Sequence, residues 1–209
     1  MSTPPFEPVT DDDVRIVTAQ LGRPARDVVG IPARCACGAP TVVATAPRLS
    51  DGTPFPTLYY LCHPGATAAV STLEATGVMA EFTRRLADEP ELRAAHQRAH
   101  DAYLADREGL GHVPEIAHVT AGGMPERVKC LHALVGHALA AGPGVNVLGD
   151  LALELAAWSP DVCRCPDWLA DADAVADADA AADADRATGP ADGATASGAP
   201  ARGEPGHGG

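Results

Sequence analysis

The chain has 209 residues, enough for one ordinary domain, and its formal net charge is −13. An acidic surface repels nucleic-acid phosphates and anionic lipid, so the charge argues against nucleic acid and membrane surfaces as partners. The N-terminus has no signal-peptide pattern and no apolar run is long enough to span a bilayer, which predicts a cytoplasmic protein without membrane insertion. In that compartment we expect the six cysteines to be reduced thiols, metal ligands or redox groups rather than a disulfide framework.

The first third of the chain is typical of one helix followed by strands. Thr10 is a suitable N-cap, three aspartates follow it, and Gly22 ends the helical spacing of apolar residues. Residues 35–40, rich in Cys, Gly and Pro, suit a hairpin connection. Three short segments rich in β-branched or aromatic residues predict a small antiparallel sheet, and they are residues 28–31, 41–45 and 57–62.

After His63 the apolar spacing changes to a helical period. The helical segments are bounded by Pro, Gly and Asp, and they are residues 64–77, 78–87, 88–108, 125–141 and 150–158. These elements predict an α+β fold, in which a bundle of about five helices packs on one face of a small antiparallel sheet of about three strands.

One globular domain is expected over residues 10–166, preceded by a flexible N-terminus over residues 1–9. Beyond Pro166 the composition shifts to Asp and Ala, with nine acidic residues against two arginines. Such a segment buries too little apolar surface to offset its chain entropy. We therefore predict a disordered acidic tail over residues 167–209, which serves as a solubilising segment or, less in keeping with its composition, as an interaction or metal-buffering tail.

The segment 125–141 carries Lys129, Cys130, His132 and His137. If the helix extends over the whole segment, Cys130 and His132 lie about 200° apart around its axis and face opposite sides. Cys130 and His137 share a face but lie about 10 Å apart, too far for one metal ion to bind both easily. Each side chain can therefore belong to a site completed by other segments, or to the core as a buried thiol and hydrogen-bonded histidines.

His96 and His100 have i, i+4 spacing within residues 88–108, which places two imidazoles on one helix face, as in some zinc sites. The stretch HQRAH lacks the Glu that follows the first His in metalloprotease helices. An exposed polar face explains the pair equally well.

Three further pairs are candidate metal ligands. They are Cys35 and Cys37, Cys62 and His63, and Cys163 and Cys165. The thiolates of the first and last pairs can close a tetrahedral zinc site that ties the first hairpin to the end of the domain. Zinc sites more often use Cys-x-x-Cys, so the Cys-x-Cys spacing suggests a structural zinc ion without requiring one.

Common catalytic motifs are absent from the sequence, including the G-x-S-x-G turn, the phosphate loop ending in Gly-Lys-Ser/Thr, and G-x-G-x-x-G. Residues 142–149 separate two predicted helices. They either present backbone N–H groups to an anion or form a tight turn fixed by the Asn146 side chain. We prefer the turn.

Two stretches, PRLSDGTPFPTLYYLCHP and GGMPERVKCLHALVGHALAAGPGVNVLGD, together resemble the bacterial family called domain of unknown function 501. The resemblance covers about residues 12–166 and departs from the family pattern at Val147, where relatives carry Pro, and at Cys62-His63, where many carry Thr-Cys. The resemblance implies no particular reaction. Relatives in actinobacteria are often encoded near septum-formation and exopolyphosphatase genes. The family's helix motif, carried onto this sequence, picks out Lys129, Cys130, His132, His137, Asn146 and Gly149.

Three functions follow as hypotheses. The first is a non-catalytic metal-binding or regulatory domain, with zinc as the candidate ion. The second is a protein-interaction module linked to cell-division or envelope machinery, which the family resemblance implies. The third is a small enzyme that uses Cys130, His132 or His137, with Lys129 and Asn146 beside them and the thiol activated by nearby cations.

Overall fold

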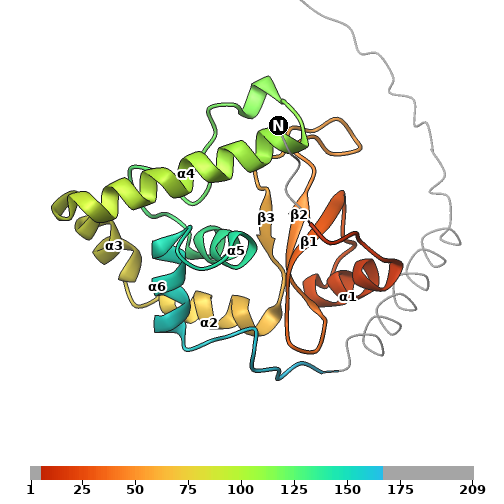
Figure 1. Ribbon diagram of the computed structural model, residues 1–209. Coiled ribbons are helices and arrows are strands. Elements are labelled where there is room, and N and C mark those ends of the chain that lie inside the picture. Colours follow the sequence, from red (N-terminus) through yellow and green to blue (C-terminus); the bar gives the residue numbers. More distant parts are fainter. Residues whose placement is uncertain (1–5, 167–209) are drawn as a thin grey trace, which may run out of the picture.

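The computed structural model describes residues 6–166 and has the α+β fold that the sequence predicts (Figure 1). The predicted tail and residues 1–5 lie outside the described residues. Across residues 6–166, no helix combines the length and apolar character needed to cross a membrane. The elements in chain order are α1 (Asp11–Leu21), β1 (Val28–Arg34), β2 (Pro40–Thr45), β3 (Tyr59–Leu61), α2 (Pro64–Glu74), α3 (Val78–Asp88), α4 (Pro90–Leu110), a 3-10 turn (Pro114–Ile116), α5 (Leu131–Ala141) and α6 (Val147–Ala156).

The sheet is antiparallel, with β2 between β1 and β3. Every residue of β2 is buried. Because successive side chains of a strand point to opposite faces, Val42 and Ala44 pack into one core while Val43 packs into another. The sheet is therefore covered on both faces.

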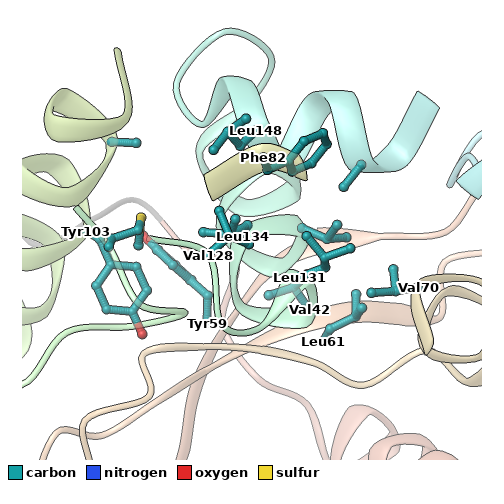
Figure 2. Close-up of a cluster of buried hydrophobic side chains, with 14 of the residues drawn as sticks. Val42, Tyr59, Leu61, Val70, Phe82, Tyr103, Val128, Leu131, Leu134 and Leu148 are labelled. Atoms are coloured by element: carbon teal, nitrogen blue, oxygen red, sulfur yellow. The ribbon is translucent and has the colours of Figure 1, made fainter. Parts of the chain in front are cut away.

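The larger core lies between the sheet and the helices α2 to α6 (Figure 2). Figure 2 shows Leu61 of the sheet facing Val70 of α2, with Leu131 of α5 beside them, and Leu134 of the same helix near Val128. All are buried, and each such side chain contributes roughly 1.5–3 kcal/mol to folding. From α4, Tyr103 reaches the sheet edge, where its hydroxyl oxygen accepts the backbone N–H of Leu58 at 2.6 Å.

The smaller core lies under α1, on the face of the sheet that the other helices leave open (Figure 1). Thr10 and Asp13 form a capping box at the start of this helix, and Val17 packs with Ile31 and Val43 of the sheet. The prediction that helices pack on one face only is thus wrong for α1. A central strand whose residues are all apolar or Thr needs an apolar cover on both faces.

Residues 6–9, part of the predicted flexible N-terminus, lie against β1. The carbonyl oxygen of Glu7 accepts the N–H of Ile31 at 3.1 Å, and its carboxylate accepts from Arg34 at 2.6 Å. The ring of Phe6 meets that of Tyr59 edge-on, with 5.9 Å between the centroids. The packed part of the chain therefore begins before the predicted residue 10.

The helix predicted over residues 125–141 begins six residues later, at Leu131. A compact loop precedes it, closed by a 2.6 Å hydrogen bond from the N–H of Lys129 to the carbonyl oxygen of Gly122. Gly122 and Gly123 both have positive φ, and a Cβ on Gly123 would lie 2.8 Å from the carbonyl oxygen of Arg127. The two glycines thus allow a loop that the helical spacing of the apolar residues does not reveal.

Candidate metal centre

The connection between β1 and β2 presents the first Cys-x-Cys pair. The N–H of Cys35 donates to the carbonyl oxygen of Ala39 at 2.8 Å, and the N–H of Gly38 donates back to the carbonyl oxygen of Cys35 at 2.7 Å. Gly38 has φ +90°, a conformation that favours glycine. This tight turn holds Cys35 as a buried residue and Cys37 as an exposed one.

The segment after α6 brings the second pair to the same place. Figure 1 shows it running from the end of α6 past α2 toward the β1–β2 connection. The carbonyl oxygen of Pro160 accepts the N–H of Ala36 at 2.8 Å, which anchors the segment to that connection. Cys163 and Cys165 follow within five residues of this anchor.

The four thiols of Cys35, Cys37, Cys163 and Cys165 form one cluster, in which every sulfur lies within 4.8 Å of the others. The Sγ atoms of Cys35 and Cys165 are 3.7 Å apart, far longer than a disulfide bond of about 2.05 Å. Four sulfurs bound tetrahedrally at about 2.3 Å from zinc lie roughly 3.8 Å from one another. The cluster therefore has the donor set and the dimensions of a four-cysteine zinc site.

His63 supports this cluster from the start of α2. Its Nδ1 accepts the backbone N–H of Ala66 at 3.3 Å, so the neutral ring carries its proton on Nε2. Nε2 lies 3.0 Å from the sulfur of Cys165, to which it donates. Burial lowers the pKa of His63, which keeps the ring neutral. His63 is thus placed as a hydrogen-bond donor to a cluster sulfur, a common outer partner of metal ligands.

The environment favours thiolate formation at the exposed side of the cluster. The pKa of Cys163 is lowered to about 7, chiefly because the backbone N–H of Cys165 faces its sulfur at 3.4 Å. Burial instead raises the pKa of Cys35. A metal cation would stabilise the charged form of both sulfurs.

Cys62 lies apart from the cluster. It packs with Val17 and Val43 on the α1 side of the sheet, where its thiol contacts the carbonyl oxygen of Pro40 at 3.6 Å. Burial raises its pKa to about 12. Of the pair Cys62 and His63, only His63 reaches the cluster, because consecutive residues at a strand end point to opposite sides.

A groove of about 760 Å³ adjoins the cluster. The ring of Trp158 lies on its wall, 5.2 Å from the ring of His63, and Cys165 also lines it. Leu153 of α6 and Val162, which is 60 % exposed, add apolar surface. The cysteine cluster therefore holds the segment that closes one side of this groove.

A second group of polar side chains lies at the other end of α2. Cys130 is the N-cap of α5, and its sulfur lies 3.9 Å from Nδ1 of His132. Glu74 accepts the N–H of Leu131 at 2.6 Å, and the same carboxylate oxygen lies 3.2 Å from Nδ1 of His132. The prediction that Cys130 and His132 face opposite sides is wrong, because the helix begins after Cys130. Glu74 itself has no recognisable signal in the sequence.

Electrostatic interactions shift the pKa values of Cys130 and His132 in opposite directions. The hydrogen bond with Cys130 and the carboxylate of Glu74 raise the pKa of His132 to about 9 against the opposing effect of burial. Burial raises the pKa of Cys130, but His132 and the N–H of Ala133 outweigh it, so the net pKa is lowered. Protonated His132 and deprotonated Cys130 therefore stabilise each other.

The remaining candidates of the enzyme hypothesis lie elsewhere. His137 and Asn146 are fully buried in the larger core, where the Asn146 amide donates to Nδ1 of His137 at 3.2 Å and accepts the N–H of Gly149 at 3.0 Å. Burial lowers the pKa of His137 to about 4. Lys129 is exposed. The five candidate residues do not line one cleft, and Asn146 fixes the turn before α6, as the preferred interpretation holds.

His96 and His100 are both buried rather than on an exposed face. Burial lowers the pKa of both rings, although a hydrogen bond with the backbone of Arg127 opposes this effect at His96. Neither histidine belongs to the groups of three or more ligands that the described residues form.

Comparison with known proteins places residues 31–154 within the family described as protein of unknown function (DUF501). The matched stretch contains the last four residues of β1, all of β2 and β3, α2 to α5 and most of α6, and it ends before the second Cys-x-Cys pair. No curated protein and no solved structure matches the chain.

Proposed function

The chain belongs to the DUF501 family, and from its cysteine cluster we propose that it is a zinc-binding, non-catalytic domain in which one zinc ion ties the C-terminal segment to the sheet. The observation that carries this proposal is the convergence of Cys35, Cys37, Cys163 and Cys165 from two ends of the sequence. Zinc is the ion that four thiolates in a tetrahedral arrangement favour.

The surroundings of the cluster support a bound cation. Zinc held by four thiolates carries a net negative charge, which N–H donors offset. His63 supplies one such donor to Cys165, and the backbone N–H of Cys165 supplies another to Cys163. Both would orient the sulfurs and reduce repulsion between them.

A regulatory role follows from where the ion would sit. The described chain after α6 contacts the β1–β2 connection through the Pro160 hydrogen bond and the cluster. A zinc ion there would close a long loop of chain. Its binding free energy would offset the conformational entropy lost when residues 159–166 become ordered. Because Cys165 and Arg164 line the groove, metal binding would set the shape of the groove.

The test is the metal content of the full chain, purified without a histidine tag and measured by inductively coupled plasma mass spectrometry. Cys35→Ser and Cys163→Ser are each expected to lose one equivalent of zinc relative to the unmodified chain. Cys62→Ala is the matched control, because Cys62 lies outside the cluster, and it should keep the full content. Equal zinc in all four proteins would overturn the proposal.

The interaction and enzyme hypotheses remain predictions. A partner from cell-division or envelope machinery would have the groove beside Trp158 as one available surface. An enzymatic role would rest on Cys130 and His132, since His137 and Asn146 lie in the core.

A further inference from the structure

Three electron-rich atoms point at one another where α2 ends and α5 begins. They are the sulfur of Cys130, Nδ1 of His132 and a carboxylate oxygen of Glu74, and all lie within 4.8 Å of one another. The oxygen and the nitrogen are 3.2 Å apart, and the sulfur and the nitrogen are 3.9 Å apart. Such atoms repel unless a proton or a metal cation lies between them.

The contacts of Nε2, the other ring nitrogen of His132, determine whether Nδ1 of the neutral ring carries a proton or a lone pair. Nε2 lies 3.3 Å from the backbone carbonyl oxygen of Thr67 and 3.2 Å from the hydroxyl of Ser71. A carbonyl oxygen only accepts hydrogen bonds, so Nε2 carries a proton. In the neutral ring Nδ1 then has its lone pair directed at Glu74 and Cys130. A backbone carbonyl on the outer nitrogen is also the usual partner of a metal-bound histidine.

From this convergence we propose a second metal site, formed by Glu74, Cys130 and His132, that binds a divalent transition metal of the zinc class. One thiolate, one imidazole and one carboxylate make a mixed donor set that zinc accepts and that hard ions such as magnesium do not favour. Three protein ligands leave a fourth position for water or a small ligand, unlike the closed four-cysteine site.

The position of the group fits such a site. The side chains of Glu74 and His132 are 23 % and 26 % exposed, so the ion would be held by the protein yet reached by solvent. Glu74 is fixed in place because it also accepts the N–H of Leu131. The site lies at the opposite end of α2 from His63, about 16 Å away by helix length, so the two metals would bind independently.

The test counts metal on the full chain. Metal-free protein is titrated with Zn²⁺ alone against a chromophoric chelator, and bound zinc is counted after gel filtration. The unmodified chain is expected to bind two equivalents, and Cys130→Ser and Glu74→Gln one each. The amide oxygen in Glu74→Gln can still accept the Leu131 N–H, so this variant should keep the fold. Circular dichroism checks that it does. His112→Asn is the matched control, because His112 pairs with Glu108 at an exposed position, and it should bind two.

The outcomes separate this inference from the proposed function. The Cys163→Ser variant should lose the zinc equivalent bound by the four-cysteine cluster and keep the equivalent that depends on Cys130. The inference is overturned if the unmodified chain binds one equivalent of zinc and both Cys130→Ser and Glu74→Gln still bind that equivalent. In that case a proton occupies the site, and Cys130 and His132 form a thiolate–imidazolium pair. If the only equivalent is lost in Cys130→Ser and kept in Cys163→Ser, the second site stands and the four-cysteine proposal falls.

Discussion

His63 uses its two ring nitrogens for different tasks. Nδ1 caps α2 by accepting the N–H of Ala66, and Nε2 donates to the sulfur of Cys165. The sequence suggested His63 as a metal ligand, but its geometry is that of a partner to a ligand. A single residue thus links the start of a helix to the cysteine cluster.

Replacing His63 by Asn is expected to weaken zinc binding at the cysteine cluster by about 10- to 100-fold. Asn is a good helix cap, so α2 keeps its start, but its short side chain does not reach Cys165. Zinc competition with a chromophoric chelator measures the affinity. His112→Asn, at an exposed position, should behave like the unmodified chain. Equal zinc affinities in the two variants would refute a role for the His63 hydrogen bond.

Helices α5 and α6 pack in close contact. Gly149 makes this possible, because a Cβ at that position would overlap the carbonyl oxygen of Leu134. Gly149→Ala should lower the free energy of unfolding by about 1–3 kcal/mol, despite the better helix propensity of Ala, because a backbone atom cannot rotate away. Urea unfolding followed by circular dichroism measures it. A variant as stable as the unmodified chain would contradict the close contact.

The segment after α6 should be held by metal rather than by a core of its own. It carries exposed Arg164 between the two cysteines of the second pair. Trypsin is therefore expected to cut after Arg164 slowly in the zinc-loaded chain and at least about tenfold faster once a chelator removes the ion. Mass spectrometry of the early fragments identifies the cut. In the Cys163→Ser variant the chelator should not change the rate of cleavage. If the chelator also leaves the cleavage rate of the unmodified chain unchanged, a metal ion does not hold this segment.

The elements show what the sequence could and could not reveal. The strands and α2 to α4 were predictable because apolar periodicity is a local signal. The meeting of the two Cys-x-Cys pairs was predictable from the four ligands that a tetrahedral zinc site needs. The start of α5 was not, since Pro125 is typical of a helix start and the loop depends on contacts between Gly122 and Lys129. Glu74 was missed because only the packing of α2 against α5 brings it to Cys130.

Buried neutral histidines should govern the response of the whole molecule to acid. Burial is the leading cause of the lowered pKa of His63, His96, His100 and His137. The unfolded chain, with histidine pKa values near about 6.5, binds more protons below that pH, so the free energy of unfolding falls as pH drops from about 6.5 toward 4. His137 alone, with its pKa lowered to about 4, accounts for about 2 kcal/mol between pH 7 and pH 5.

Urea unfolding of the metal-free chain at several pH values, in the presence of a chelator, measures this loss. His112→Asn should leave the pH dependence unchanged, because the side chain of His112 is 64 % exposed. Stability that stays constant from pH 7 to pH 5 would show that the buried histidines accept protons in the folded state.

At the scale of the molecule, the sheet separates a small core under α1 from a large core under α2 to α6, and the cysteine cluster joins the end of the described chain to the sheet. The two candidate metal sites lie at opposite ends of α2. If both bind zinc, this one helix connects the ion that orders the C-terminal segment with an ion open to solvent.

The most direct test of the four-cysteine site is X-ray absorption at the zinc edge of the Cys130→Ser chain loaded with one equivalent of zinc. This variant removes the second site and leaves Cys35, Cys37, Cys163 and Cys165 unchanged. The expected first shell is four sulfur atoms at about 2.3 Å. A shell dominated by nitrogen or oxygen at about 2.0–2.1 Å would contradict a zinc ion held by these four cysteines.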